Sequence, residues 1–476
     1  MDNLSIKKII YLKGNKKNIS ISAWIRNKRV SKNFSFLSLN DGTTAQNFQV
    51  VIDNNTISQN ILAEMSIGAS VLAMGNLFWN EKDQKNELVA EEIKLLGPSS
   101  ENYPLQPKKH SMEFLRSIAH LRARTNTFGA VFRLRGAITH AIHSFFYEND
   151  FVNFSSPLIT TTDGEGAGEM FTLSALNFEK KNKINFEEDF FSEKASLTVT
   201  GQLEAETAIF GLNRVYTFGP TFRAENSNTT RHLAEFWMIE PEAAFFDLND
   251  NIALATNMLK YCIRFCLENN LEDIKFLEEK KSKENKNLDA DYLTKKLEKV
   301  LNEDFQRITY SEAIEILKNK NECKETFLKE IKNWGDELQT EHEKFLVDHY
   351  FRKPVIITDY PKKSKAFYMK QNDDGKTVAA MDILFPDLGE IVGGAQREEN
   401  WDRLQEAISF FKIKEESINW YLDTRKFGSV IHSGFGLGLE RLVMFISGIE
   451  NIRDVIPFPR TPGNARNGFW KYNFFK

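Results

Sequence analysis

The sequence predicts an α+β protein with a small β-barrel at its N-terminus and a larger domain that mixes strands and helices. Three observations carry this prediction. Residues 18–98 hold short alternating β-segments with turn signals between them, residues 128–146 have the period of an amphipathic helix, and residues 158–265 mix both patterns. With 476 residues, of which 41% are hydrophobic, the chain is long enough for two or more domains with sizeable cores.

The predicted barrel consists of alternating runs with one helix-like piece between them, at 19–25, 34–39, 48–52, 57–65, 70–75 and 87–90. This arrangement is typical of barrels of the oligonucleotide-binding kind. Residues 1–50 carry nine Lys/Arg against two acids, so an anionic partner is expected there, although charge alone fits a solvated lysine face as well. We divide the chain into a barrel domain (1–98), a linker (99–112) and a second domain (113–476).

The remaining composition is that of an ordinary globular protein. With a net charge of −4, the chain as a whole is not expected to bind nucleic acid through its overall charge. No apolar run reaches the length of a membrane span. The N-terminus lacks signal and transit patterns, and three cysteines fit a reducing compartment, so a cytoplasmic location is expected. Cys262 and Cys266 fall in an apolar helical pattern and are expected to be buried packing residues.

Residues 268–352 differ from their surroundings. They are rich in Lys and Glu, helical in period and weakly apolar. We expect a helical insertion on the surface of the second domain, without chemistry of its own.

The stretch from Phe222 to Glu240 is the most informative part of the sequence. Arg223 and Glu225 are expected to project from one face of a strand, the Asn/Ser/Thr run after them is turn chemistry, and a returning strand presents Phe236, Met238 and Glu240. A guanidinium, an aromatic ring and a carboxylate over one small area suit a nucleotide. An ordinary hairpin with surface salt bridges is the alternative.

Near the C-terminus, three alternate glycines, Gly434, Gly436 and Gly438, precede Arg441. We expect a tight glycine-rich turn that enters a helix, with Arg441 in the first helical turn. A dinucleotide-binding unit is excluded because too little chain follows, and a Walker loop is excluded because no Gly-Lys-Ser/Thr is present.

On these motifs the chain resembles the class II aminoacyl-tRNA synthetases, within them the aspartate/asparagine/lysine subgroup. The first signature matches the long helix, the following strand and Pro157, the second matches Phe222 to Glu240, and the third matches 436–441. The resemblance implies an antiparallel catalytic sheet flanked by helices and an anticodon-binding barrel of the OB type in front of it. It also implies a homodimer, whose interface includes Pro157.

The resemblance implies a site for ATP and Mg²⁺. Arg223, Arg441 and Glu225 would be the catalytic residues: Arg223 would hold the α-phosphate, and Arg441 the γ-phosphate. Phe236 would stack on adenine against Arg441. The resemblance implies that ATP is bound by Arg223, Arg231, His232, Phe236, Glu390 and Arg441. It implies that the metal is bound by Asp382 and Glu390. Without the resemblance, the two acids read as a strand-end salt bridge.

The amino-acid site implied by the resemblance includes Glu165, Gln202, Glu225, Glu240 and Arg397. Enzymes for aspartate carry a lysine three residues after the position of Gln202, where this chain has Ala205. A buried carboxylate without that cation is poorly compensated, whereas a neutral amide needs one donor and one acceptor, which Arg397 and Glu225 supply. We therefore predict asparagine as the substrate and tRNA(Asn) as the partner, with an aspartate or dual enzyme as the alternative.

For the barrel, the resemblance implies that Phe36 stacks on the central anticodon base, Gln49 bonds its edge, and Arg26 and Arg29 contact the RNA backbone. A core position is the alternative for Phe36. Two further alternatives concern the whole chain. A binding-only relative is expected to lose Arg223, Glu390 or Arg441, all of which are present, and an amide-forming synthetase is expected to lack the barrel.

Overall fold

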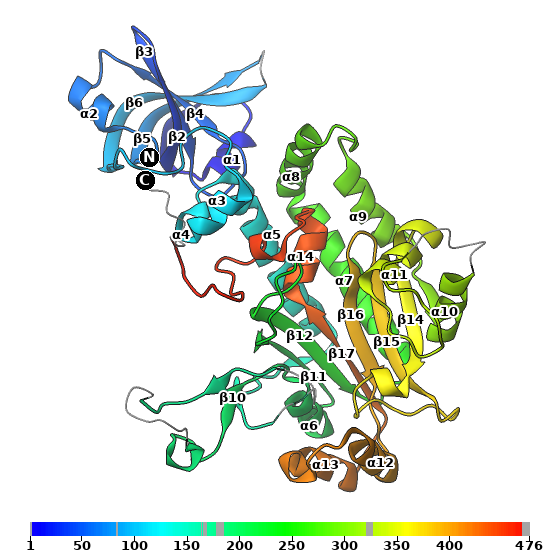
Figure 1. Cartoon of the computed structure of the whole chain (residues 1–476). Helices are drawn as coiled ribbons and strands as arrows, with labels where there is room; N and C mark the ends of the chain where they lie inside the picture. The colour runs from blue at the N-terminus through cyan, green and yellow to red at the C-terminus, as the bar shows by residue number, and fades with distance from the viewer. Residues whose placement is uncertain are drawn as a thin grey trace. The chain divides into compact units, whose positions relative to one another are not determined.

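The structure is a computed structural model that describes residues 2–81, 84–162, 164, 169–177, 185–319 and 327–468. The chain divides into two compact units (Figure 1). The first comprises 1–133, 270–290 and 466–476, and the second comprises 134–269 and 291–465. None of the described helices combines the length and the apolar character needed to cross a membrane.

The first unit contains the predicted barrel. Its strands follow the order β1-β2-β3-β4-β6-β5, and the additional pairing of β2 with β5 closes the barrel. The closure confirms the predicted barrel, and its alternating strands place Leu37 and Leu39 in a core that excludes water. The elements are β1 (Asp2–Asn3), α1 (Ile6–Ile10), β2 (Lys16–Val30), β3 (Phe34–Asn40), β4 (Phe48–Asp53), α2 (Gln59–Glu64), β5 (Ser70–Asn80) and β6 (Lys85–Gly97).

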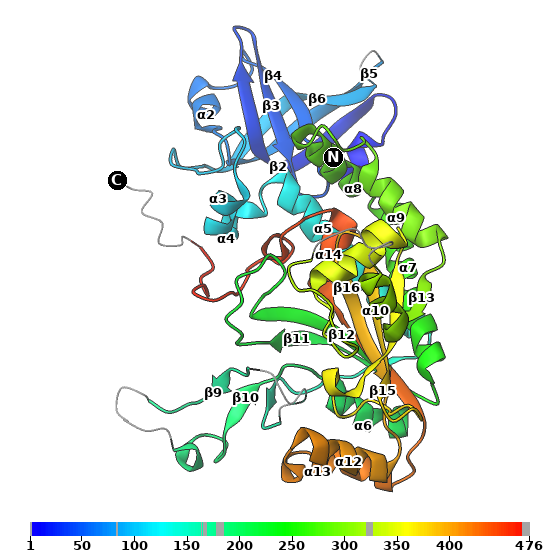
Figure 2. The same ribbon diagram turned by 45° about the vertical axis from the view of Figure 1, so that its right-hand side comes forward.

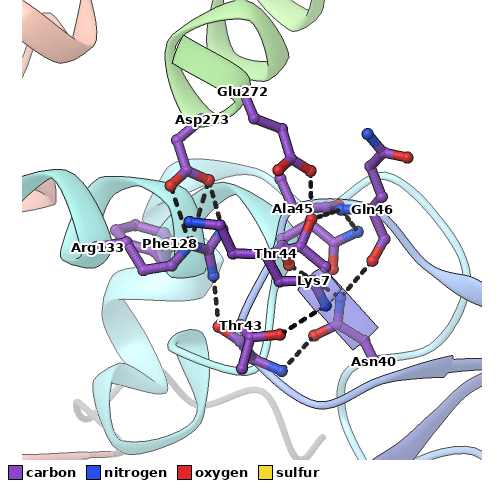
Figure 3. Close-up of polar contacts among 12 residues, drawn as sticks. Lys7, Asn40, Thr43, Thr44, Ala45, Gln46, Phe128, Arg133, Glu272 and Asp273 are labelled. Atoms are coloured by element: carbon purple, nitrogen blue, oxygen red, sulfur yellow. Dashed lines mark hydrogen bonds and ion pairs between the residues drawn. The ribbon is translucent and has the colours of Figure 1, made fainter. Parts of the chain in front are cut away.

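Three helices and the start of a fourth complete the first unit: α3 (Met112–Ser117), α4 (Ala119–Arg122), α8 (Leu271–Glu284) and the first turns of α5 (Asn126–Glu148). The loop after β3 lies against them (Figure 3). Arg133 of α5 donates to the Gly42 carbonyl at 2.7 Å and pairs with Asp273 of α8 at 2.6 Å. Asn40 donates to the carbonyl of Gln46 at 2.9 Å, so the loop is held both internally and by the helices.

The second unit is built on an eight-stranded sheet of order β13-β14-β15-β16-β17-β12-β11-β7. Neighbours are antiparallel except at the two edges, where β13–β14 and β11–β7 are parallel. The strands are β7 (Val152–Asn153), β11 (Arg214–Phe222), β12 (Glu235–Ala244), β13 (Gln306–Thr309), β14 (Val355–Pro361), β15 (Thr377–Phe385), β16 (Gly389–Gln396) and β17 (His432–Gly438).

Helices cover this sheet. The α7 helix (Leu248–Asn269) packs across β15, β16 and β17, and α6 (Gln202–Leu212) packs on β11 and β12 (Figures 1 and 2). Buried Cys262 and Cys266 lie on α7 and are free thiols, as predicted. The other elements are β8 (Ile159–Thr160), β9 (Thr172–Leu173), β10 (Ala195–Leu197), α9 (Tyr292–Asn302), α10 (Tyr310–Lys318), α11 (Thr340–Lys344), α12 (Trp401–Phe411), α13 (Asn419–Lys426) and α14 (Leu439–Ser447).

The region 268–352 is helical for most of its described length, but it also joins the sheet. Its strand β13 pairs with β14, and Ala313 and Ile314 of α10 belong to the hydrophobic cluster beneath that edge. A π-helical turn (Phe345–Tyr350) follows α11 and places Phe345 in the same cluster. The segment therefore contributes to the core of the second unit and not only to its surface.

Candidate active site

The predicted hairpin is formed by β11 and β12, which pair from Arg214↔Ala243 to Phe222↔Glu235. Arg223 follows the last residue of β11 and still donates its backbone N–H to Ala234 at 3.0 Å. Beyond it the ladder ends, because the N–H of Ala224 turns away to the carbonyl of Glu169. Arg223 and Glu225 thus lie in the connecting loop, and the prediction that they alternate on a strand is wrong.

One cavity of about 180 Å³ brings the nucleotide motifs together. Arg223 and Arg441, two hundred residues apart in the sequence, both line it. The guanidinium of Arg223 lies 5.5 Å from the centre of the Phe236 ring, which presents an aromatic face to the same space. The other predicted residues on its wall are Glu225, Arg231, His232, Met238 and Glu390.

The glycine-rich segment is a strand and not the predicted tight turn. Gly434, Gly436 and Gly438 lie on β17 between β12 and β16, and α14 begins directly after them. Close packing requires a glycine at position 434, where a Cβ would lie 2.1 Å from Glu242 Cδ, while a Cβ at Gly436 would meet only the flexible end of Met238, at 2.9 Å from its Cε. Gly436 and Gly438 both line the cavity, and because they have no side chains they leave its space free.

Arg441 lies in the first turn of α14, as predicted, and Glu440 fixes that turn. Glu440 is buried, accepts the backbone N–H of Trp237 at 3.0 Å and pairs with Arg135 of α5 at 2.7 Å. Arg441 itself donates to the Glu390 carbonyl at 2.8 Å. The helix end, two strands and α5 therefore hold one guanidinium in place.

Two further basic groups lie beside Arg441. Arg231 donates to the carbonyl of Asp387 at 3.3 Å, and burial together with the charge of Arg441 lowers its pKa. The same two causes lower the pKa of His232, which keeps its imidazole neutral at pH 7. A cluster of like charges facing one cavity is a site for an anion such as a polyphosphate.

The predicted metal ligands meet over a glycine. A Cβ at Gly393 would lie 3.0 Å from Glu390 Oε1 and 3.5 Å from Asp382 Oδ1, so the two carboxylates converge on the space that Gly393 leaves free. Asp382 also pairs with Lys365 at 2.7 Å, and burial raises its pKa. Within the described ranges no group of three or more His, Cys, Asp or Glu side chains is placed to hold a metal ion. Two carboxylates fit Mg²⁺, which takes its remaining ligands from phosphates and water.

Glu343 is a site residue that the sequence did not reveal. It belongs to α11, within the segment expected to carry no chemistry, and its Oε2 accepts the backbone N–H of Glu390 at 3.2 Å. A Cβ at Gly389 would lie 2.7 Å from that oxygen and 3.5 Å from Arg231 Nη1, so Glu343 lies close to both the loop and this arginine. Burial and the charge of Glu390 raise the pKa of Glu343 to about 7.

The predicted amino-acid residues form a second, buried cluster beside the cavity. Glu240 accepts hydrogen bonds from the Gly201 backbone at 2.9 Å and from Thr217 at 3.1 Å, and also from Thr200. Burial raises the pKa of Glu240, and these bonds and the charge of Arg223 oppose that shift. Glu225 lies apart, in the nucleotide cavity, and Glu165 falls outside the described residues.

Arg397 is 2% exposed and is held by a carboxylate that the motifs did not indicate. Its Nε donates to Glu242 Oε2 at 3.2 Å, and its Nη2 bonds the other oxygen, which makes the pair bidentate. Glu242 lies two residues after Glu240 on β12, so only the strand alternation hinted at it. The position of the Arg397 guanidinium is therefore fixed by the protein itself.

The barrel presents its predicted RNA-binding residues in two places. Phe36 is half-buried on the outer face of β3, is absent from the core cluster, and has Arg29 stacked 4.9 Å from its ring. Gln49 is exposed on the neighbouring strand and donates to Glu87 at 3.0 Å. Arg26 lies apart from them, in a groove also lined by Tyr103 and Arg124, where burial lowers its pKa.

Comparison with known proteins decides the family. The model for tRNA synthetases class II (D, K and N) matches residues 111–462, well over half of the chain. The chain belongs to this family. A second model, the OB-fold nucleic acid binding domain, matches residues 19–96 of this class II synthetase and confirms the predicted fold class.

Individual relatives of this class II synthetase agree. It is 51% identical to the asparagine–tRNA ligase of Parabacteroides distasonis, over 94% of this chain and 95% of that protein. It is 49% identical to the asparagine–tRNA ligase of Clostridium tetani, over 98% and 100%. Among solved structures it resembles asparaginyl-tRNA synthetase from Pyrococcus horikoshii complexed with asparaginyl-adenylate, at 30% identity and a TM-score of 0.83, over 98% and 99%.

Proposed function

We propose that this protein is an asparagine–tRNA ligase, which uses ATP to attach asparagine to tRNA(Asn). The observation that carries the proposal is the meeting of Arg223 and Arg441 in one cavity with the Phe236 ring. Two distant arginines around an aromatic plate provide the charge and the stacking surface that a nucleoside triphosphate needs. Relatives that share half of the sequence over nearly its whole length carry this name.

ATP binds in this cavity. Phe236 stacks on the adenine, Arg223 holds the α-phosphate, and Arg441 reaches the γ-phosphate. Arg231 adds a second positive charge beside Arg441, and the neutral imidazole of His232 lines the same wall. Because Arg231 and Arg441 are held by hydrogen bonds to backbone carbonyls, they face the phosphates without reorganisation.

Asp382 and Glu390 are the residues of this chain that would hold Mg²⁺, over the space left by Gly393. When bound, the ion supplies positive charge to the phosphate oxygens and orients the leaving group. The carboxylate of Glu343 holds the Glu390 loop in place by accepting a hydrogen bond from the backbone N–H of Glu390.

Asparagine binds in the buried cluster. Glu165 and Gln202 hold its α-amino and carboxylate groups, Glu240 is a further residue of the site, and Arg397 donates to the side-chain amide oxygen. Ala205 is fully buried among Ile209, Val215 and Ala244, an apolar setting that offers no cation for a substrate carboxylate. A pocket of this kind favours the neutral amide over aspartate.

The reaction has two steps. An oxygen of the asparagine carboxylate forms a bond to the α-phosphorus while the bond to the bridging oxygen breaks, and pyrophosphate leaves. Arg223, Arg441 and Glu225 surround this centre and orient the reacting groups. The terminal ribose hydroxyl of the tRNA then attacks the carbonyl carbon of the adenylate, and AMP leaves. No side-chain nucleophile is required.

The barrel binds the anticodon. Phe36 stacks on a base, Gln49 bonds the edge of that base, and Arg29 and Arg26 contact the RNA backbone.

The proposal also includes three properties of the whole protein. It forms a homodimer, it is located in the cytoplasm, and its domains are the barrel (1–98), a linker (99–112) and the catalytic domain (113–476).

The test is ATP–pyrophosphate exchange with each of the twenty amino acids, followed by charging of tRNA(Asn). Exchange that depends on asparagine supports the function, and exchange with aspartate alone contradicts it. Arg223→Ala is expected to lower exchange by about 10²-fold or more, since it removes a group that faces the developing charge. Arg403→Ala, which removes a guanidinium that pairs with Asp373 outside the cavity, serves as the matched control.

A further inference from the structure

A carboxylate that the mechanism above does not use lies at the centre of the buried polar cluster. Glu206, on α6, has no exposed surface. Its Oε2 accepts hydrogen bonds from the Tyr421 hydroxyl at 2.6 Å, from Arg425 Nη2 at 2.8 Å and from His432 Nε2 at 3.2 Å. Three side chains from α13 and β17 therefore meet at one carboxylate oxygen, and burying so many polar groups costs more than apolar packing would.

The other carboxylate oxygen faces the amino-acid pocket. Glu206 Oε1 accepts from Gln202 Nε2 at 2.9 Å and lies 3.8 Å from Arg397 Nε. Gln202 is proposed to hold the α-groups of asparagine, and Arg397 is proposed to bind its side chain. Glu206 thus contacts the proposed readers of both ends of the substrate.

This cluster contains charged groups of both signs. Two guanidinium groups, Arg397 and Arg425, face two carboxylates, Glu206 and Glu242. Although burial opposes ionisation of Glu206, the hydrogen bond from His432 and the charges of Arg425 and Arg397 lower its pKa, so it stays anionic. Burial lowers the pKa of His432, and its contacts with Glu206 and with the Val430 carbonyl oppose that shift.

Removing the charge of Glu206 shifts the charge around Arg397 in the same direction whether Glu242 is protonated or ionised. Burial raises the pKa of Glu242, so Glu242 is the group in the cluster that protonates first. Removing the carboxylate of Glu206 makes the surroundings of Arg397 more positive by at most one unit, because the charge of Glu206 is one cause of the raised pKa of Glu242, which can ionise in response. A more positive pocket binds the aspartate carboxylate better, and leaves the neutral amide of asparagine without that gain.

We propose that Glu206 is a specificity-determining residue, which selects asparagine against aspartate by balancing the positive charges of Arg397 and Arg425. It acts through Arg397 and Gln202 and is in this sense a positioning residue. The proposal rests on the proposed function and deepens it: Ala205 withholds a cation from the pocket, and its neighbour Glu206 adds an anion.

The first experiment uses the full-length chain with Glu206→Gln, which keeps the shape and the acceptor for Gln202 but removes the charge. The measured quantity is the ratio of kcat/KM for asparagine to kcat/KM for aspartate in pyrophosphate exchange. Where aspartate exchange is too slow, the inhibition constant of aspartate against asparagine exchange replaces it. The ratio is expected to fall about tenfold or more. An unchanged ratio in a folded variant overturns the proposal.

The second experiment reverses the sign. Arg425→Gln removes a positive charge and leaves Glu206 in place, so discrimination against aspartate is expected to rise or hold while it falls in Glu206→Gln. A fall in both variants shows that disruption of the cluster, and not its charge, sets the ratio. Thermal unfolding shows whether each variant is folded. If one of the two variants does not fold, the other is sufficient to test the proposal.

Two controls separate charge from geometry and from surface effects. Tyr421→Phe removes one hydrogen bond to Glu206 without changing the charge, and its ratio is expected to stay within about twofold of the parent protein. A shift as large as that of Glu206→Gln contradicts the charge argument. Glu406→Gln makes the same chemical change on an exposed position of α12 and should leave the ratio unaltered.

The parent protein tells the two proposals apart. If the parent protein does not support asparagine-dependent exchange, the proposed function is wrong. The role of Glu206 in selecting asparagine against aspartate is then wrong as well. If it activates asparagine and discriminates against aspartate, but none of the variants shifts that discrimination, only the role of Glu206 is wrong.

Discussion

The carboxylate of Glu242 occupies the space that a side chain at Gly434 would need. A Cβ built on Gly434 would lie 2.1 Å from Glu242 Cδ, a distance that no relaxation of a side chain tip resolves, since the carboxylate is pinned by Arg397. A strand residue with no chemistry of its own therefore decides where the guanidinium of Arg397 lies.

This relationship predicts the effect of Gly434→Ala. The added methyl displaces Glu242, and breaking a buried pair costs about 3–5 kcal/mol. We expect kcat/KM for asparagine in pyrophosphate exchange to fall about 10²-fold, with a smaller change in KM for ATP. Gly211→Ala is the matched control, because no atom lies within 4 Å of its added Cβ and the substitution favours helix. Normal asparagine activation in Gly434→Ala contradicts the role given to Glu242.

A second prediction concerns Glu343, which supports the Glu390 loop from α11. Glu343→Gln replaces the carboxylate that accepts the Glu390 N–H and faces Arg231 with a weaker acceptor. We expect KM for ATP to rise about 10-fold while KM for asparagine stays near that of the parent protein. Glu330→Gln, an exposed position outside the cavity, is the control. Equal changes in both KM values point to general loss of structure.

A third prediction concerns the barrel. Phe36→Ala removes the half-buried ring under Arg29, and stacking on a base is worth about 1–3 kcal/mol. KM for tRNA in the charging reaction should rise about 10-fold or more, with ATP–pyrophosphate exchange unchanged because that step needs no tRNA. Phe78→Ala removes another exposed aromatic side chain of the barrel and serves for comparison. A similar effect of both substitutions assigns the change to barrel stability.

A fourth prediction concerns acid stability. Burial lowers the pKa of His342, whose Nδ1 accepts the Gln339 N–H at 2.9 Å and whose Nε2 bonds the Lys329 carbonyl at 2.8 Å. The unfolded chain binds a proton more readily than the folded one, so the stabilisation is present above the ordinary histidine pKa and is lost as pH falls through the lowered value. Tm should therefore fall between pH 7 and pH 5.

His342→Gln provides the check on this assignment. Its amide retains an acceptor and a donor but takes up no proton, so the fall in Tm with pH should be shallower than in the parent protein. Parallel curves for the two proteins assign the acid sensitivity to other groups, among them His143 and His432, whose pKa values burial also lowers.

Local patterns in the sequence predicted the elements well. Alternation predicted the barrel strands, and a 3.6-residue period predicted α5, because both depend on burial of one face. Composition predicted less about 268–352, since β13 is short and its partner lies far along the chain. The loop position of Arg223 was missed because the residue alternation of a strand continues in the sequence past the point where the hydrogen bonds stop.

The site was predictable only through motifs. Arg223 and Arg441 were named because their neighbours match signatures, and their meeting in one cavity depends on the order of strands in the sheet. Glu206, Glu242 and Glu343 have ordinary surroundings in the sequence, and each gains its role from a partner 47 to 226 residues away. Long-range contacts of this kind leave no local period to detect.

The alternate glycines of β17 have an evolutionary consequence. Two of the three lie beneath a side chain of the neighbouring strand β12: Glu242 covers Gly434, and Met238 covers Gly436. A mutation at Gly434 is tolerated only if Glu242 is replaced by a smaller residue at the same time, whereas the flexible end of Met238 can move away from a side chain at Gly436. Drift toward a new amino-acid preference must then proceed through paired replacements, and single-site libraries across this strand will under-report the sequences that the fold accepts.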